Sequence, residues 1–139
     1  MGYNPHKRFS IYRIPPTEND DQWRQQIVQG YVHDMGAAML GGVGGHAGLF
    51  ADANDLAVMM QMLLNGGYYG GRGYPNGATT KNYTMQQKQG SRRGLGYDKP
   101  EPNPNNKPST STRAPLSVFG HTGFTGTCTW ADPQNKVVF

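Results

Sequence analysis

The stretch ADANDLAVMMQMLLNGG, residues 51–67, carries the clearest periodic signal in the sequence. Its large apolar residues recur at i, i+3, i+4, i+7 and i+8, which is the spacing of one face of an α-helix. These residues are Leu56, Met59, Met60, Leu63 and Leu64. Asp52 suits the N-cap, and Asn65-Gly66-Gly67 supplies a left-handed stop. The pattern predicts a helix near residues 52–65 that faces a core, which is the usual role of a Met and Leu stripe.

The C-terminal stretch LSVFGHTGFTGTCTWADPQNKVVF, residues 116–139, alternates short apolar runs with turn residues. Residues 127–131 read as a strand, 132–135 as a turn, and 137–139 as a further strand. Together with the apolar pair before the first glycine, they predict about three antiparallel strands near 117–139. The expected fold class is therefore α/β, of the α+β kind, with one core helix and a small antiparallel sheet.

The N-terminal third is polar and gives weaker signals. Pro15-Pro16 excludes a helix at that point, and Thr17 with Asp20 fits the cap of a short helix that would carry Trp23, Ile27 and Val28. Residues 31–50 are rich in glycine and small apolar side chains, which suits close passage of backbone past backbone. They are expected to form an ordered, largely buried loop.

Composition and motif spacing give no support for a cofactor or a metal. The single cysteine, Cys128, excludes an internal disulfide and a cysteine-cluster metal site. The spacing of His33, His46 and His121 matches no metal-ligand pattern. GGVGGHAG, residues 41–48, approaches a dinucleotide-binding loop, but no strand leads into it and no acidic residue follows at the required distance. No apolar run approaches the length that crosses a bilayer.

Positive charge concentrates between residues 81 and 113. This segment contains seven basic and two acidic residues, a surplus of five positive charges, whereas the whole chain has a net charge of +4. The basic residues are Lys81, Lys88, Arg92, Arg93, Lys99, Lys107 and Arg113. Such a surplus indicates either a solvated loop or contact with a nucleic acid or another anionic polymer, and the scarcity of interleaved aromatic residues favours the loop. Residues 98–116, rich in Pro, Asn, Ser and Thr, are expected to form a mobile surface loop.

The motif FGHTGFTG, residues 119–126, is the candidate functional site. Glycine lets the backbone approach a bound substrate, a threonine hydroxyl can orient a carboxylate or carbonyl, and a following N–H can point at an oxyanion. This is the logic of the K-T-G element in penicillin-recognising serine hydrolases. The alternative is an ordinary glycine-rich turn.

Four motifs together resemble a known family. IPPTEND, VHDMGAAMLGGVGGHAGLFADANDLAVMMQMLLNGG, RRGLGYDK and FGHTGFTGTCTWADPQNKVVF are similar, in order and spacing, to the C-terminal part of the serine β-lactamase-like family. That family spans class C β-lactamases, D-alanyl-D-alanine carboxypeptidases, aminopeptidases and esterases. The resemblance covers the chain from about Arg13 to its end, apart from residues 98–116. Similar sequences also occur behind a family 3 glycoside hydrolase domain in large exported proteins.

The resemblance implies roles for four residues. His121 and Thr122 would be the catalytic residues of the K-T-G position, where many members carry His in place of Lys. Gly123 and Phe124 would contact substrate, with the N–H of Phe124 as the second oxyanion donor. The parent protein would be an exported serine hydrolase acting by acyl transfer on β-lactam, D-amino-acid peptide or ester substrates, including peptidoglycan-derived ones.

The nucleophile of that family is absent from this sequence. No serine has a lysine three residues later, as S-x-x-K requires. Tyr74-Pro75-Asn76 matches Y-x-N but lies after the long helix, in the wrong order for the family. Residues 1–139 are therefore expected to form a single partial domain that carries one wall of the site and is inactive alone. Its partner would be the missing N-terminal part of the domain, and exposed strand edges would favour self-association.

A different class of function stays open. The chain, or the protein it comes from, would then be a non-catalytic relative that keeps the fold to bind peptidoglycan or a polyanion, helped by the basic segment.

Overall fold

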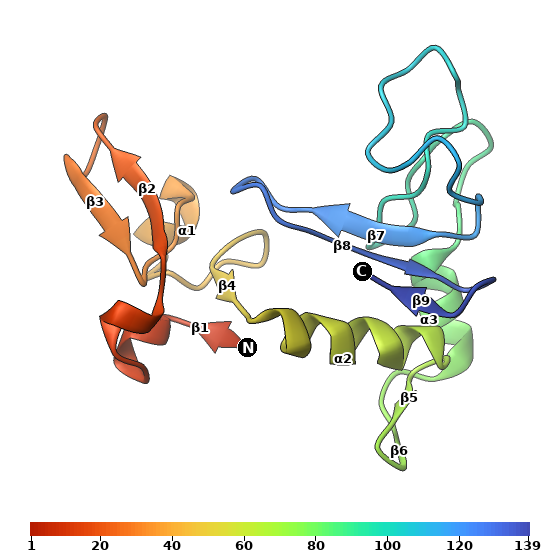
Figure 1. The fold of residues 1–139 in the computed structure, drawn as a ribbon, viewed down its shortest axis with the longest axis horizontal. Coiled ribbons are helices and arrows are strands. Elements are labelled where there is room, and N and C mark those ends of the chain that lie inside the picture. Colours follow the sequence, from red (N-terminus) through yellow and green to blue (C-terminus); the bar gives the residue numbers. More distant parts are fainter. The chain divides into compact units, whose positions relative to one another are not determined.

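The computed structural model describes residues 1–139 and shows a mixed α/β chain with three α-helices, two 3-10 helices and small antiparallel sheets (Figure 1). The chain divides into two compact units, residues 1–53 and 54–139. None of the helices has both the length and the apolar character needed to cross a membrane.

The first unit is built from short elements. Strands β1 (Gly2–Tyr3) and β4 (Leu49–Phe50) pair antiparallel, and so do β2 (Pro16–Asp20) and β3 (Gln26–Gln29). Two 3-10 helices, η1 (Pro5–Lys7) and η2 (Ile11–Arg13), lie between β1 and β2, and helix α1 (Met35–Met39) follows β3. The unit has little regular structure, so side-chain hydrogen bonds hold much of it together.

The short helix predicted between Thr17 and Val28 is wrong, because this segment is the β2–β3 hairpin. The carboxylate of Asp20 accepts hydrogen bonds from the backbone N–H groups of residues 22–24 at 2.9–3.1 Å, which closes a turn instead of starting a helix. Gln25 then adopts a left-handed conformation with φ of 49°. In β3, Val28 is buried whereas Ile27 is 65% exposed, which is the alternation of a strand.

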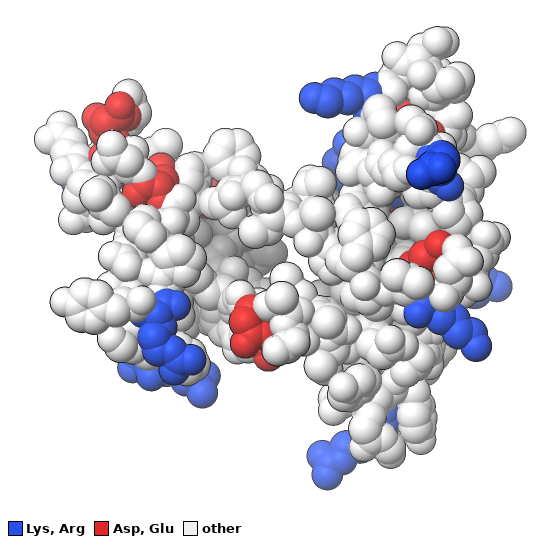
Figure 2. Space-filling view, viewed as in Figure 1, with Lys and Arg blue, Asp and Glu red and all other residues white.

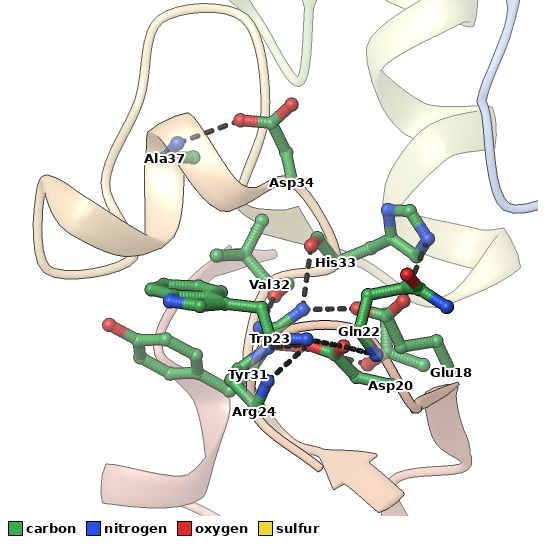
Figure 3. Close-up of polar contacts among 11 residues, drawn as sticks. Glu18, Asp20, Gln22, Trp23, Arg24, Tyr31, Val32, His33, Asp34 and Ala37 are labelled. Atoms are coloured by element: carbon green, nitrogen blue, oxygen red, sulfur yellow. Dashed lines mark hydrogen bonds and ion pairs between the residues drawn. The ribbon is translucent and has the colours of Figure 1, made fainter. Parts of the chain in front are cut away.

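Arg24 ties this hairpin to the chain that follows it (Figure 3). Its Nε donates to Asp20 Oδ2 at 2.6 Å, and its terminal nitrogens donate to the carbonyl oxygens of Val32 and His33 at 2.7 and 2.8 Å and to the carboxylate of Glu18. Glu18 Oε2 also lies 3.1 Å from His33 Nε2. The hydrogen bond from Arg24, reinforced by the backbone donors of the turn, holds the pKa of Asp20 well below its usual range.

The expectation of a largely buried loop over residues 31–50 is only partly met. Helix α1 forms inside it, because Asp34 caps the helix by accepting the backbone N–H of Ala37 at 2.7 Å. Ala37 is fully buried, but Met39 and Leu40 are exposed. The segment is ordered around a capped helical turn whose outer face is apolar.

The second unit contains the elements that the sequence predicts most clearly. Helix α2 (Ala53–Leu64) confirms the predicted core helix, and Gly66 and Gly67 end it with φ of 66° and 90°. Strands β7 (Phe119–Thr122), β8 (Cys128–Asp132) and β9 (Val137–Val138) form one antiparallel sheet in the order β7-β8-β9, which confirms the three expected strands.

Two elements of this unit were not anticipated. A small hairpin joins β5 (Tyr68–Tyr69) to β6 (Arg72–Gly73), and helix α3 (Gly77–Thr84) follows. The sequence of α3, GATTKNYT, has no apolar stripe that would reveal a helix. Its N-cap is Asn76, whose side chain accepts the backbone N–H of Thr79 at 2.8 Å.

The core of the second unit lies between α2 and the sheet. Met60 and Leu63 of α2 pack with Phe119 of β7 and Ala131 of β8, and the last two are directly paired across the sheet. The ring of Tyr97 meets that of Phe119 edge-on, with centroids 5.4 Å apart. This packing confirms the prediction that the Met and Leu stripe faces a core, and it fixes the first half of β7.

Candidate functional site

Strand β7 carries the HTG motif from the core to the surface. Its first two residues, Phe119 and Gly120, are buried, whereas His121 and the residues after it are exposed. Gly120 exchanges two backbone hydrogen bonds with Asp98, at 2.7 and 3.0 Å, while β8 pairs with the other edge of the strand. A Cβ at Gly120 would lie 2.7 Å from the ring of Trp130, so only glycine fits here. The motif therefore projects from a strand that is held on both edges.

The imidazole of His121 has a partner at each nitrogen. Nδ1 lies 2.6 Å from the carbonyl oxygen of Thr122, and Nε2 lies 3.0 Å from Nη1 of Arg93. A carbonyl only accepts hydrogen bonds and a guanidinium only donates them, so one neutral tautomer satisfies both contacts: Nδ1–H donates and Nε2 accepts. In this arrangement neither ring nitrogen is available to a substrate.

The buried carboxylate of Asp98 lies near the arginine that contacts this histidine. Asp98 is 2% exposed, and its Oδ1 lies 3.4 Å from Nε of Arg92 and 3.7 Å from Nε of Arg93. The same oxygen accepts the backbone N–H of Lys99 at 3.1 Å. The carboxylate, the two guanidinium groups and His121 form what we call the Asp98 cluster, defined by Asp98, Arg92, Arg93 and His121. It places positive charge beside the exposed end of β7.

The residues after His121 form a tight turn. Gly123 N–H donates to the carbonyl of Thr127 at 2.7 Å, and Gly126 N–H donates to the carbonyl of Gly123 at 3.1 Å. Phe124 lies in this turn with 90% of its surface exposed. The four candidate residues, His121, Thr122, Gly123 and Phe124, thus lie on one continuous strand and turn.

Lys99 is a buried basic residue near the site. Its Nζ donates to the carbonyl oxygens of Thr84 at 3.0 Å and Ser117 at 3.4 Å, and burial lowers the pKa of its ammonium. These bonds join the C-terminal end of α3 to the residues just before β7. Lys99 therefore supports the scaffold of the site, although it lies at the start of a segment expected to be a surface loop.

The other histidines belong to separate contacts in the first unit. His46 Nε2 lies 2.8 Å from Asp34 Oδ1, and His33 pairs with Glu18. The hydrogen bond from the backbone N–H of Ala37, and to a smaller extent the bond with His46, lower the pKa of the Asp34 carboxyl. No three side chains among His, Cys, Asp and Glu gather into a set that could hold a metal ion.

Sequence reasoning found the HTG segment but not Arg93 or Asp98 as its neighbours. Both stand in RRGLGYDK, a motif that the sequence singled out only for its family resemblance and its charge. Arg93 and His121 are 28 positions apart, and they meet where Asp98 pairs with both Arg93 and Gly120 beside β7. The adjacent arginines within a conspicuous motif were the one available signal.

Comparison with known proteins assigns the chain to a family. The profile of the family described as Beta-lactamase matches residues 5–139. The chain therefore belongs to the β-lactamase family, as the four motifs predict. No solved structure matches it significantly.

Relatives of known name give the same result over nearly the whole chain. A protein of Escherichia coli (strain K12) is 39% identical over 135 residues, which cover 96% of this chain and 30% of that protein. One from Salmonella gallinarum is 41% identical over 147 residues, covering 97% and 34%, and the same values hold for one from Salmonella typhi. All three carry the name "Putative D-alanyl-D-alanine carboxypeptidase". The chain thus spans about a third of the length of these relatives.

Proposed function

We propose that this chain forms one wall of the acyl-transfer site of a serine hydrolase, with the nucleophile contributed by another part of a longer protein. The observation that carries the proposal is the HTG segment at the exposed end of β7, anchored by the buried Phe119 and Gly120. The sequence supports a nucleophile outside this chain, because no S-x-x-K occurs in these 139 residues.

The proposed roles follow from the chemistry of each group. The hydroxyl of Thr122 would hydrogen-bond the carbonyl or acidic end of a substrate lying along the strand, and His121 would join it once the Arg93 guanidinium moves away from Nε2. Gly123 would let that substrate approach the backbone, and the N–H of Phe124 would stabilise the oxyanion that forms when the acyl carbon is attacked. Held groups of this kind lower the barrier because they need no reorientation during the reaction.

We further propose that the substrates are peptides ending in D-amino acids, of the kind found in peptidoglycan. The name shared by the relatives supports this choice, together with their identity across nearly the whole chain. β-Lactams and simple esters are the next candidates, since both are acyl donors to the same type of serine nucleophile. We propose an exported parent protein as the context of the chain, and fusion to a family 3 glycoside hydrolase domain is one form that this parent could take.

Hydrolysis assays on two proteins test this function. The purified 139-residue chain is expected to turn over no D-alanyl-D-alanine peptide, β-lactam or ester. The longer gene product, with S-x-x-K and Y-x-N preceding this segment, is expected to turn over the peptide and to lose at least about 100-fold in kcat/KM on His121→Ala. Turnover by the chain alone that His121→Ala abolishes would show that the nucleophile lies within it. Full activity of the longer protein with His121→Ala would show that His121 takes no part in the mechanism.

The surplus of positive charge between residues 81 and 113 suggests a second candidate function, that of a non-catalytic binder of cell-wall polymer or another polyanion. On the face drawn in Figure 2, Lys and Arg side chains are spread over several places instead of forming one patch. Arg92 and Arg93 are also paired with Asp98. Salt-sensitive binding to peptidoglycan or nucleic acid, lost on neutralising these two arginines, would favour the binder.

A further inference from the structure

Arg93 makes the contact that decides the state of His121. Its Nη1 donates to His121 Nε2 at 3.0 Å, although the two residues come from different parts of the second unit. Arginine keeps its positive charge and offers only donors, so a nitrogen that meets it must present its lone pair. The contact therefore selects against a proton on Nε2.

Two features attach Arg93 to the strand that carries His121. Its Nε lies 3.7 Å from Oδ1 of the buried Asp98, and Asp98 is bonded through its own backbone to Gly120, the residue before His121. The guanidinium is thus attached to the strand that carries the histidine. Arg92 shares only the contact with Asp98. Its Nε lies 3.4 Å from the same carboxylate oxygen, whereas the hydrogen bond to the imidazole comes from Arg93.

We propose that Arg93 is a positioning residue for His121, which it holds in the neutral Nδ1–H tautomer with Nε2 engaged. This inference rests on the proposed function and deepens it. A nitrogen that accepts from Arg93 cannot donate to a substrate oxygen at the same time. While Arg93 is in place, Nε2 of His121 therefore neither donates to a substrate nor transfers a proton, and both roles require the guanidinium to move away.

The tautomer can be observed directly in the ¹⁵N-labelled chain. Long-range ¹H–¹⁵N correlation spectra, recorded at a pH where the imidazole is neutral, distinguish Nδ1–H from Nε2–H. The Nδ1–H form is expected for His121 in the unsubstituted chain. Arg93→Met, which keeps an unbranched side chain but removes every donor, is expected to lower the share of this form. Arg92→Met is the matched control, since it removes the neighbouring guanidinium and leaves the contact with His121.

Each outcome decides the inference. A dominant Nε2–H form in the unsubstituted chain would overturn it, and so would Arg93→Met and Arg92→Met spectra with the same tautomer shares. The amide signals of Asp98 and Gly120 report whether the strand is intact in each variant. If Arg93→Met disturbs them, a scalar coupling across the hydrogen bond between Arg93 Nη1 and His121 Nε2 in the unsubstituted chain supplies the test, and its absence at low temperature would count against the proposal.

These measurements are independent of turnover. An inactive longer protein with an Nδ1–H histidine would refute the proposed hydrolase and leave the positioning role intact. An active longer protein with an Nε2–H histidine would do the reverse.

Discussion

Arg24 and Arg93 both pair with buried carboxylates, and they differ in how completely they are held. Arg24 is 12% exposed and donates to two carboxylates and two backbone carbonyls, most of them at 2.6–2.8 Å. Arg93 is 53% exposed, lies 3.7 Å from its carboxylate, and donates to an imidazole. Arg24 uses four of its five N–H donors within the first unit and therefore serves the fold. Arg93 is attached but adjustable, which suits a group beside a reacting substrate.

The largest difference between the two is expected when each is replaced by methionine. Arg24→Met leaves Glu18 and Asp20 without their cation and two carbonyls without a donor, so the amides of β2 and β3 should exchange at least about tenfold faster with solvent. Arg93→Met should change the exchange of amides in β7 and β8 by less than about threefold, because its side chain is half exposed. Hydrogen exchange measured by NMR gives both values. Equal effects would erase the distinction between a structural and an adjustable arginine.

A substitution at Gly120 tests how Arg93 is attached to β7, because the backbone of Gly120 bonds to Asp98, the partner of Arg93. A methyl group at this position would overlap the carbonyl of Thr129 and the ring of Trp130. Gly120→Ala is expected to destabilise the second unit by roughly 2–3 kcal/mol, measured by urea unfolding. Gly77→Ala is the control, since the nearest atom to a Cβ at the start of α3 is 3.7 Å away and alanine is the better helix former. A Gly120→Ala chain as stable as the Gly77→Ala chain would mean that β7 is not packed as described.

These contrasts also show what the sequence could predict. Helix α2 and strands β7–β9 were predictable because apolar period and turn chemistry are local signals that agreed with the packing. The signal at Asp20 was ambiguous, because an aspartate that caps a helix and one that closes a turn both accept nearby backbone N–H groups. Whether the segment forms a turn or a helix depended on the bonds from Arg24 to the carbonyls of Val32 and His33, and no local pattern reveals those bonds. The pairing of Arg93 with His121 was hidden for the same reason.

Acid should affect the first unit through Asp20. Its pKa is lower in the folded chain than in the unfolded one, so the unfolded chain binds the proton first and stability is lost as pH falls below the ordinary aspartate pKa. Its contribution is fully present above that value. Asp20→Asn is expected to flatten the fall in stability of the β2–β3 hairpin between about pH 4 and pH 2. Asp21→Asn removes the neighbouring carboxylate as a control, and a matching loss of slope in both variants would contradict the role of Asp20.

The smallest effect is expected at Asn76, the last residue of the only Y-x-N match in the chain. Its side chain accepts the N–H of Thr79 and caps α3, so Asn76→Ala should cost about 1 kcal/mol of stability. Asn76→Asp, which keeps an acceptor at the cap, should restore most of it. Asn82→Ala, within the same helix, serves as the control for substitution alone. If instead Asn76→Asp abolished turnover by the longer protein without changing stability, this asparagine would belong to the catalytic machinery, and the order of motifs along the chain would no longer argue against it.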